Sequence, residues 1–217
     1  NTANITVNPN PAAFTVKAQN AQVCIGAKAT LTVSSSQPNV NYQIRLKADN
    51  SAVGAPVAGT GGQITLETPV LNTTGSFNFY VQATSGIAPT YCGTQMSNEV
   101  TITVNALPSR TLEFIEGALN ADGTMNLIVR NSEVNVLYQL RMNGTDFRTP
   151  VAGNGGDAVL VSDVVSSEKK TYTVAARNIN SGCPVELEQK IELQSITPLP
   201  VELVSFKAVA RQHQVLL

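Results

Sequence analysis

Apolar and polar residues alternate with a period of two along most of this chain. In residues 40–47 the apolar positions are Val40, Tyr42, Ile44 and Leu46, and polar residues fill the positions between them. This alternation is typical of a β-strand that buries one face and exposes the other. Shorter stretches of the same kind lie at residues 29–33, 64–66, 77–83, 100–104 and 127–129. Helical periodicity is missing, so the pattern predicts an all-β protein.

The strand pattern is repeated within the chain. The block Val-Asn-Tyr-Gln-Ile-Arg-Leu around Tyr42 returns as Val-Leu-Tyr-Gln-Leu-Arg-Met around Tyr138, 96 positions later. The run Ala-Gly-Thr-Gly-Gly at 58–62 returns as Ala-Gly-Asn-Gly-Gly at 152–156. Blocks repeated in the same order are the signature of tandem domains. With boundaries near the prolines, we predict domains at residues 1–107 and 108–197, followed by a segment at 198–217.

Short strands separated by turn residues, over roughly 90–100 residues, predict an immunoglobulin-like β-sandwich for each domain. The chain has no Trp. Tyr42 and Tyr138 are therefore expected to fill the core position on the third strand. In immunoglobulin folds, whose strands are lettered in chain order, a tyrosine often lies at the corner between strands E and F. Tyr172 stands at this E–F corner, and Phe79 occupies the same place in the first repeat without a hydroxyl. The predicted fold class is all-β, with two tandem immunoglobulin-like sandwiches.

The last segment is expected to belong to a further module. Val201 and Leu203 alternate as in a strand, and the sequence closes on Val215, Leu216 and Leu217. Such side chains each contribute about 1.5–3 kcal/mol when buried. We therefore expect residues 198–217 to be the first strands of a truncated third module. The alternative is a C-terminal strand that completes the second sandwich.

Three cysteines offer one intramolecular bond. Cys24 lies just before a predicted strand and Cys92 lies between the last two strands of the first domain, two points expected to meet at one end of a sandwich. A Cys24–Cys92 disulfide would stabilise the domain by about 4 kcal/mol in the loop-entropy model. Asn120 occupies the position that matches Cys24, so Cys183 is expected to be unbonded. Three buried thiols in a reducing compartment are the alternative.

Composition excludes several kinds of partner. Charged residues make up 13% of the chain, the net charge is −1, and no run of Lys or Arg occurs. These values argue against binding to nucleic acid or to an anionic membrane surface. No stretch approaches the roughly 20 apolar residues of a membrane span. We expect a polar, nearly neutral surface.

Residue sets that carry chemistry are sparse. His213 is the sole histidine, which excludes histidine-based triads for practical purposes. The pair Glu186 and Glu188 is better explained as a solvated strand face than as a glycosidase pair. The Gly-rich runs at 58–62 and 152–156 are predicted to be turns rather than ligand loops. We expect no catalytic residue, no cofactor and no metal site, so the chain is predicted not to be an enzyme.

Calcium binding is a weak alternative for three acidic loop residues of the second repeat. Asp146, Asp157 and Asp163 lie in predicted loops, but their spacing matches no known calcium loop. Solvated loop acids are the simpler interpretation.

The chain also resembles a known family. Cys24-Ile25-Gly26 before Leu31-Thr32-Val33, then Cys92 before residues 100–104, resembles the Ig-like repeats of large secreted proteins of gliding bacteria. The sequence Leu-Pro-Val-Glu-Leu-Val-Ser-Phe-Lys-Ala from Leu199 is similar to the opening of the module that commonly precedes their C-terminal sorting domain for type IX secretion. The resemblance implies a secreted or cell-surface protein. We therefore expect a non-enzymatic structural or adhesive spacer whose partners are neighbouring domains of the same chain.

The alternative function is a glycan-binding accessory module of a secreted enzyme. Its partner would be a surface glycan, and another cell-surface protein is the comparable partner for an adhesive module. Glycan-binding modules stack sugars on exposed aromatic rings. Tyr80 is expected to point outward from its strand, Tyr91 lies beside Cys92, and Phe147 lies in the matching region of the second repeat. These three scattered rings are the candidate glycan contacts.

Overall fold

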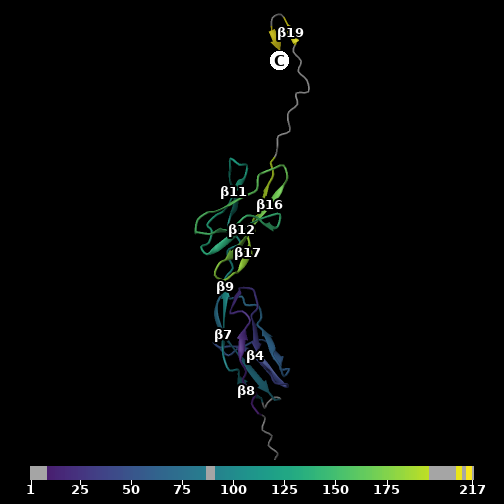
Figure 1. Ribbon diagram of the computed structural model, residues 1–217, viewed down its shortest axis with the longest axis vertical. Helices are drawn as coiled ribbons and strands as arrows, with labels where there is room; N and C mark the ends of the chain where they lie inside the picture. Colours follow the sequence, from purple (N-terminus) through teal and green to yellow (C-terminus); the bar gives the residue numbers. More distant parts are fainter. Residues whose placement is uncertain (1–8, 87–90, 196–208, 212–213, 217) are drawn as a thin grey trace, which may run out of the picture.

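The computed structural model describes residues 9–86, 91–195, 209–211 and 214–216. Within these ranges the chain forms strands and turns without a helix, as the alternation of apolar residues predicts. Consequently, these ranges contain no helix suited to crossing a membrane. Figure 1 shows the two sequence repeats one after the other along the long axis. The protein is all-β and has an immunoglobulin-like fold.

The first repeat contains two sheets. The smaller has the strand order β1-β3-β6, formed by Val16–Ala18, Thr30–Val33 and Ile64–Glu67. The larger has the order β2-β9-β7-β4-β5, formed by Gln22–Cys24, Val100–Asn105, Gly75–Ser85, Val40–Leu46 and Ala52–Ala58. Strand β8, Cys92–Gln95, also pairs with β7. Only the β2–β9 pair is parallel among these ladders.

The second repeat is built in the same way. Its smaller sheet has the order β10-β11-β15, formed by Phe114–Leu119, Met125–Val129 and Ala158–Val161. Its larger sheet has the order β13-β12-β16-β17, formed by Thr145–Asp146, Val136–Met142, Lys170–Asn178 and Pro184–Glu186. Strand β14, Val151–Ala152, pairs with β12, and β18, Ile191–Leu193, pairs with β16.

Each repeat has its own hydrophobic core. The first joins side chains of both sheets, among them Leu31, Ile44 and Val81. The second does the same with Leu127, Leu140 and Val174. The inward residues are the alternating apolar positions of the sequence, because successive side chains of a strand point to opposite faces. The described residues thus form two separate cores.

The C-terminal segment is described only in part. Strands β19, Val209–Arg211, and β20, Gln214–Leu216, pair antiparallel with each other. Val201, Leu203 and His213 lie outside the described residues. The assignment of residues 198–217 to a third module therefore stays a prediction.

Candidate functional site

The Gly-rich runs of both repeats form turns. Gly61 and Gly155 have φ of 92° and 90°, a left-handed conformation that favours glycine. A Cβ added at Gly59 would collide with the carbonyl oxygen of Gln37, and one at Gly153 with that of Glu133. The turn therefore needs glycine for both conformation and close approach. These runs are structural, as the sequence predicted.

Two buried tyrosines hold these turns. Tyr42 accepts a hydrogen bond from the backbone N–H of Gln37 at 2.8 Å, and Tyr138 accepts one from Glu133 at the same distance. Both rings are fully buried. Burial raises the pKa of the Tyr138 hydroxyl above its usual range. Each ring fills the core while its hydroxyl satisfies a backbone donor that water cannot reach.

The outer face of the larger sheet carries a hollow in each repeat. In the first repeat the hollow has a volume of about 340 Å³, and Gln43, Arg45, Gln82 and Tyr91 lie among its lining residues. Tyr91 is 63% exposed, so its ring is accessible to a ligand. The Arg45 guanidinium donates to the carbonyl oxygen of Asn50 at 2.8 Å, which fixes its position. An exposed ring beside polar groups is an arrangement that can contact a sugar.

The matching hollow of the second repeat has no aromatic lining residue among those described. Its volume is about 320 Å³, and it is lined in part by Leu137, Arg141, Arg177 and Pro184. Arg141 is occupied by two carboxylates, at 2.9 Å from Asp146 and 3.2 Å from Glu186. The Asp146 hydrogen bond raises the pKa of Arg141. This hollow is therefore a salt-bridged surface rather than a stacking platform.

The two other candidate glycan contacts are covered by protein. Tyr80 is only 8% exposed and donates its hydroxyl hydrogen bond to Asn50, so its ring is covered and does not offer a free stacking face. Tyr80 pairs with Arg45 on the outer face of the sheet, as the alternation predicts, but neighbouring residues cover its ring, including Lys47 with Nζ 5.9 Å from the ring centroid. Phe147 packs against the second core, with its ring centroid 6.5 Å from that of Tyr172. Tyr91 alone of the three rings is strongly exposed.

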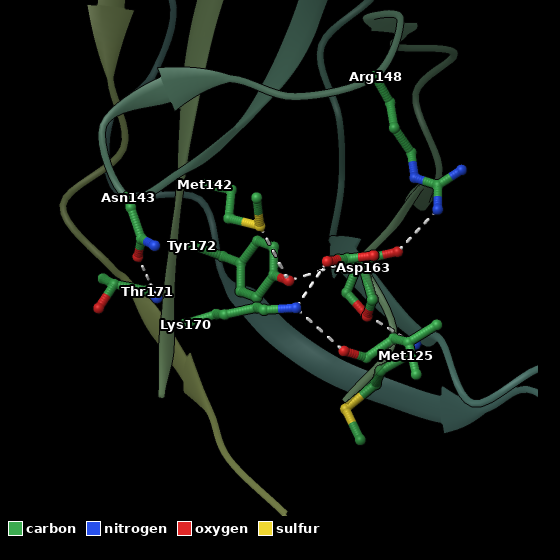
Figure 2. Close-up of polar contacts among 10 residues, drawn as sticks. Met125, Met142, Asn143, Arg148, Asp163, Lys170, Thr171 and Tyr172 are labelled. Atoms are coloured by element: carbon green, nitrogen blue, oxygen red, sulfur yellow. Dashed lines mark hydrogen bonds and ion pairs between the residues drawn. The ribbon is translucent and has the colours of Figure 1, made fainter. Parts of the chain in front are cut away.

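A polar cluster closes one corner of the second sandwich (Figure 2). The Lys170 ammonium donates to Asp163 Oδ2 at 2.6 Å and to the carbonyl oxygen of Val164 at 3.3 Å. The Asp163 backbone N–H donates to the Tyr172 hydroxyl at 3.1 Å. Arg148 donates to the carbonyl oxygen of Ser162 at 3.0 Å from the other side. Tyr172 thus holds the E–F corner, where its sequence position suggested.

The electrostatics of this cluster favour a stable ion pair. The hydrogen bond from Lys170 lowers the pKa of Asp163, and the same bond raises the pKa of Lys170. A lysine that acts as a nucleophile needs a lowered pKa, so that part of it is uncharged at neutral pH. The arrangement therefore fastens the corner and does not activate the amine.

The acidic residues considered for calcium or catalysis face cations or solvent. Asp146 pairs with Arg141 and Asp163 with Lys170, while Asp157 is exposed. The described residues contain no group of three or more side chains able to hold a metal ion. The carboxylate of Glu186 pairs with Arg141, and that of Glu188 pairs with Arg110 at 3.3 Å. These carboxylates form solvated ion pairs within one strand region.

The disulfide joins the two repeats. Cys24 is bonded to Cys183, with a Cα–Cα distance of 5.6 Å and a sequence separation of 159 residues. The predicted bond between Cys24 and Cys92, and the prediction that Cys183 is unbonded, are therefore wrong. The observed bond connects the end of β2 with the residue immediately before β17.

Strand direction explains why Cys24 does not bond to Cys92. In the larger sheet, Cys24 pairs with Asn105 beside the Gly75 end of β7, whereas Cys92 pairs with Ser85 at the other end. Ten residues of strand separate these ends by roughly 33 Å. A disulfide requires Cα atoms within about 7 Å. Figure 1 shows the same separation, with β9 and β17 at the junction and β8 at the far end.

Sequence reasoning missed Cys183 as a bonded residue. A signal was present, because Cys92 and Cys183 occupy the same place in the two repeats. Following the direction of each strand would have put Cys183 at the end of its repeat that faces the first repeat. The choice of disulfide partner therefore depends on the directions of the strands. The spacing of the cysteines along the sequence does not reveal those directions.

Comparisons with known proteins concern the first repeat and the fold. Residues 11–106 match the family described as an Ig-like domain, CHU_C associated. No curated protein matches the chain. The chain is similar to a marsupial T cell receptor, with 14% identity over 85% of this chain and 99% of that chain and a TM-score of 0.37.

Two further solved structures are similar to the chain. One is the central fibronectin-III array of RIM-binding protein, with 17% identity over 87% of this chain, 64% of that chain and a TM-score of 0.34. The other is the human OSCAR ligand-binding domain, with 12% identity over 86% of this chain, 100% of that chain and a TM-score of 0.31.

Proposed function

We propose that the chain is a structural spacer of an extracellular protein, because residues 11–106 match the family described as an Ig-like domain, CHU_C associated. Its two repeats act as tandem Ig-like domains, at residues 1–107 and 108–197. The observation that carries the proposal is the Cys24–Cys183 bond, which fastens one repeat to the other. A covalent clamp between neighbouring domains is suited to holding other parts of a protein at a fixed distance.

Three further observations support this role. The repeats have separate cores, as expected of domains that fold as units. Disulfides persist chiefly in oxidising environments, which supports a secreted or cell-surface location. The carboxylates considered for catalysis are paired with Arg or Lys or exposed, and we propose that the chain is not an enzyme.

Small-angle X-ray scattering tests the spacer role. The oxidised protein should give a narrow distribution of interdomain distances, because the clamp restricts bending at the linker. The variant Cys183→Ser should broaden that distribution, and Cys92→Ser, which keeps the clamp, should not. If oxidised protein and Cys183→Ser give equally broad distributions, the clamp does not fix the spacing and the proposed role fails.

Glycan binding is the second candidate function, and Tyr91 is the observation that favours it. Its ring is exposed at the hollow of about 340 Å³ in the first repeat. A glycan array should then show binding that Tyr91→Ala abolishes and that Tyr91→Phe retains, because stacking uses the ring rather than the hydroxyl. An array without binding, or binding unaffected by Tyr91→Ala, would exclude this role for the hollow.

A further inference from the structure

The Cys24–Cys183 bond encloses most of the folded protein in one covalent loop. The bond spans 159 residues and encloses every strand from β3 to β16. Among the buried core residues that the structure describes, only Val16 in the first repeat and Leu187, Ile191 and Leu193 in the second lie outside the loop. Both cores are therefore almost entirely inside it.

A load applied along the chain reaches the disulfide from both sides. Tension entering near residue 9 passes through β1 and β2 to Cys24. From Cys24 it crosses the sulfur–sulfur bond to Cys183, and then leaves through β17 and β18. The disulfide carries the tension past the backbone between the two cysteines, because the covalent bond is the shorter connection. That backbone cannot be drawn out while the bond remains.

Only short ladders remain exposed to the load within the described strands. Strand β1 pairs with β3 over three residues, and β2 pairs with β9 over three. Strands β17 and β18 each pair with β16 over three residues. The long ladders, such as the seven pairs that join β4 to β7, lie wholly inside the loop.

We propose that the Cys24–Cys183 bond is a tension bypass that protects both cores from mechanical unfolding. The spacer thereby keeps its length under load as well as at rest. The bypass rests on the proposed spacer role and adds a mechanical function to it.

Single-molecule force–extension measurements test the bypass. The whole chain would be held by peptide tags at its two ends, in oxidising buffer and again after reduction. Reduction should release roughly 520–570 Å of additional extension, which is the separation of 159 residues at about 3.3–3.6 Å each. Cys183→Ser should show this extension without reduction, and Cys92→Ser should behave as the unaltered protein does.

The outcomes separate the bypass from the spacer role. Two unfolding steps in the reduced protein support tandem domains, whatever the oxidised protein does. If the oxidised protein also extends by the full length, the bypass is overturned while the two-domain arrangement stands. If the reduced protein unfolds in one step, the proposed pair of independent domains is contradicted.

Discussion

Single residues explain why the two repeats share so many identical positions. Tyr42 and Tyr138 each fill a core and accept one backbone hydrogen bond, and Gly59 and Gly153 let the same turn approach that ring. The sequence predicted the burial of both tyrosines, because alternation along a strand determines which face a residue occupies. The sequence did not predict the hydrogen bonds of the two hydroxyls. Their donors lie in loops, and the alternation of apolar and polar residues along the strands does not determine the path of a loop.

Replacing Tyr138 by Phe should reveal this role. The variant leaves the Glu133 N–H without its acceptor, and a buried donor left unsatisfied costs about 1–3 kcal/mol. We expect the free energy of unfolding of the second repeat to fall by that amount in urea denaturation. Tyr91→Phe is the control, because an exposed hydroxyl should contribute less than about 0.5 kcal/mol. Equal losses of stability in the two variants would contradict the stabilising role of the hydrogen bond between Glu133 and the Tyr138 hydroxyl.

Gly59 offers a second test within the turn. Gly59→Ala places a Cβ against the Gln37 carbonyl oxygen and the Tyr42 ring, so the turn must shift. We expect a loss of about 3 kcal/mol in the free energy of unfolding, measured in urea. Gly62→Ala is the matched control three residues away, where the nearest atom would lie at 4.0 Å. Its effect should stay within about 0.5 kcal/mol, and a similar loss in both variants would show that the close approach at Gly59 is not the cause.

Among the structural elements, the E–F corner distinguishes the repeats. In the second repeat Lys170 and Tyr172 of β16 meet Asp163, whereas Phe77 and Phe79 occupy the matching positions of β7. Those two rings stack with centroids 6.4 Å apart. The sequence indicated the place of Tyr172, but not the Lys170–Asp163 pair, because the loop between them determines whether the charges meet.

The ion pair at this corner predicts a pH dependence. The pKa of Asp163 is lowered from its ordinary value of 3.8, chiefly by the Lys170 hydrogen bond. The stability that the charged Asp163 carboxylate contributes is therefore fully present above pH 3.8, and it is lost as the pH falls through the lowered pKa. Asp163→Asn should lower stability at neutral pH and flatten the decline at acid pH.

Urea midpoints measured between neutral and acid pH provide the check. Asp157→Asn is the control, because it removes an exposed carboxylate of the same repeat that forms no ion pair within the described ranges. A decline as steep in Asp163→Asn as in the unaltered protein would rule out the ion pair as its source.

At the scale of the whole molecule, the sequence predicted the repeat and most strands but not the connection between repeats. Repeated blocks reveal architecture because each repeat buries the same alternating positions. The bond between Cys24 and Cys183 depends on how one repeat faces the other. The way in which the repeats face each other leaves no trace in the pattern of either repeat. The spacing of the cysteines along the sequence therefore favoured a bond within the first repeat.

The clamp should contribute strongly to stability. Cross-linking residues 159 apart restricts the unfolded chain and contributes about 5 kcal/mol in the loop-entropy model. We expect Cys183→Ser to unfold at a lower urea concentration than the oxidised protein, with a loss of free energy approaching that value. After reduction, the unaltered protein and the variant should unfold at nearly the same concentration. A persistent difference would indicate a local packing effect of Cys183 instead.

The separation of Cys24 from Cys92 also bears on how the correct bond is made. Both cysteines lie in the first repeat, so in an oxidising compartment an unfolded first repeat could bond them to each other before the second repeat supplies Cys183. Once the first core has formed, its strands hold those two thiols roughly 33 Å apart, which prevents their bonding. Folding of the first repeat therefore keeps Cys24 available for Cys183. The direction of strand β7 thus favours the observed bond whenever the first repeat folds before its thiols are oxidised.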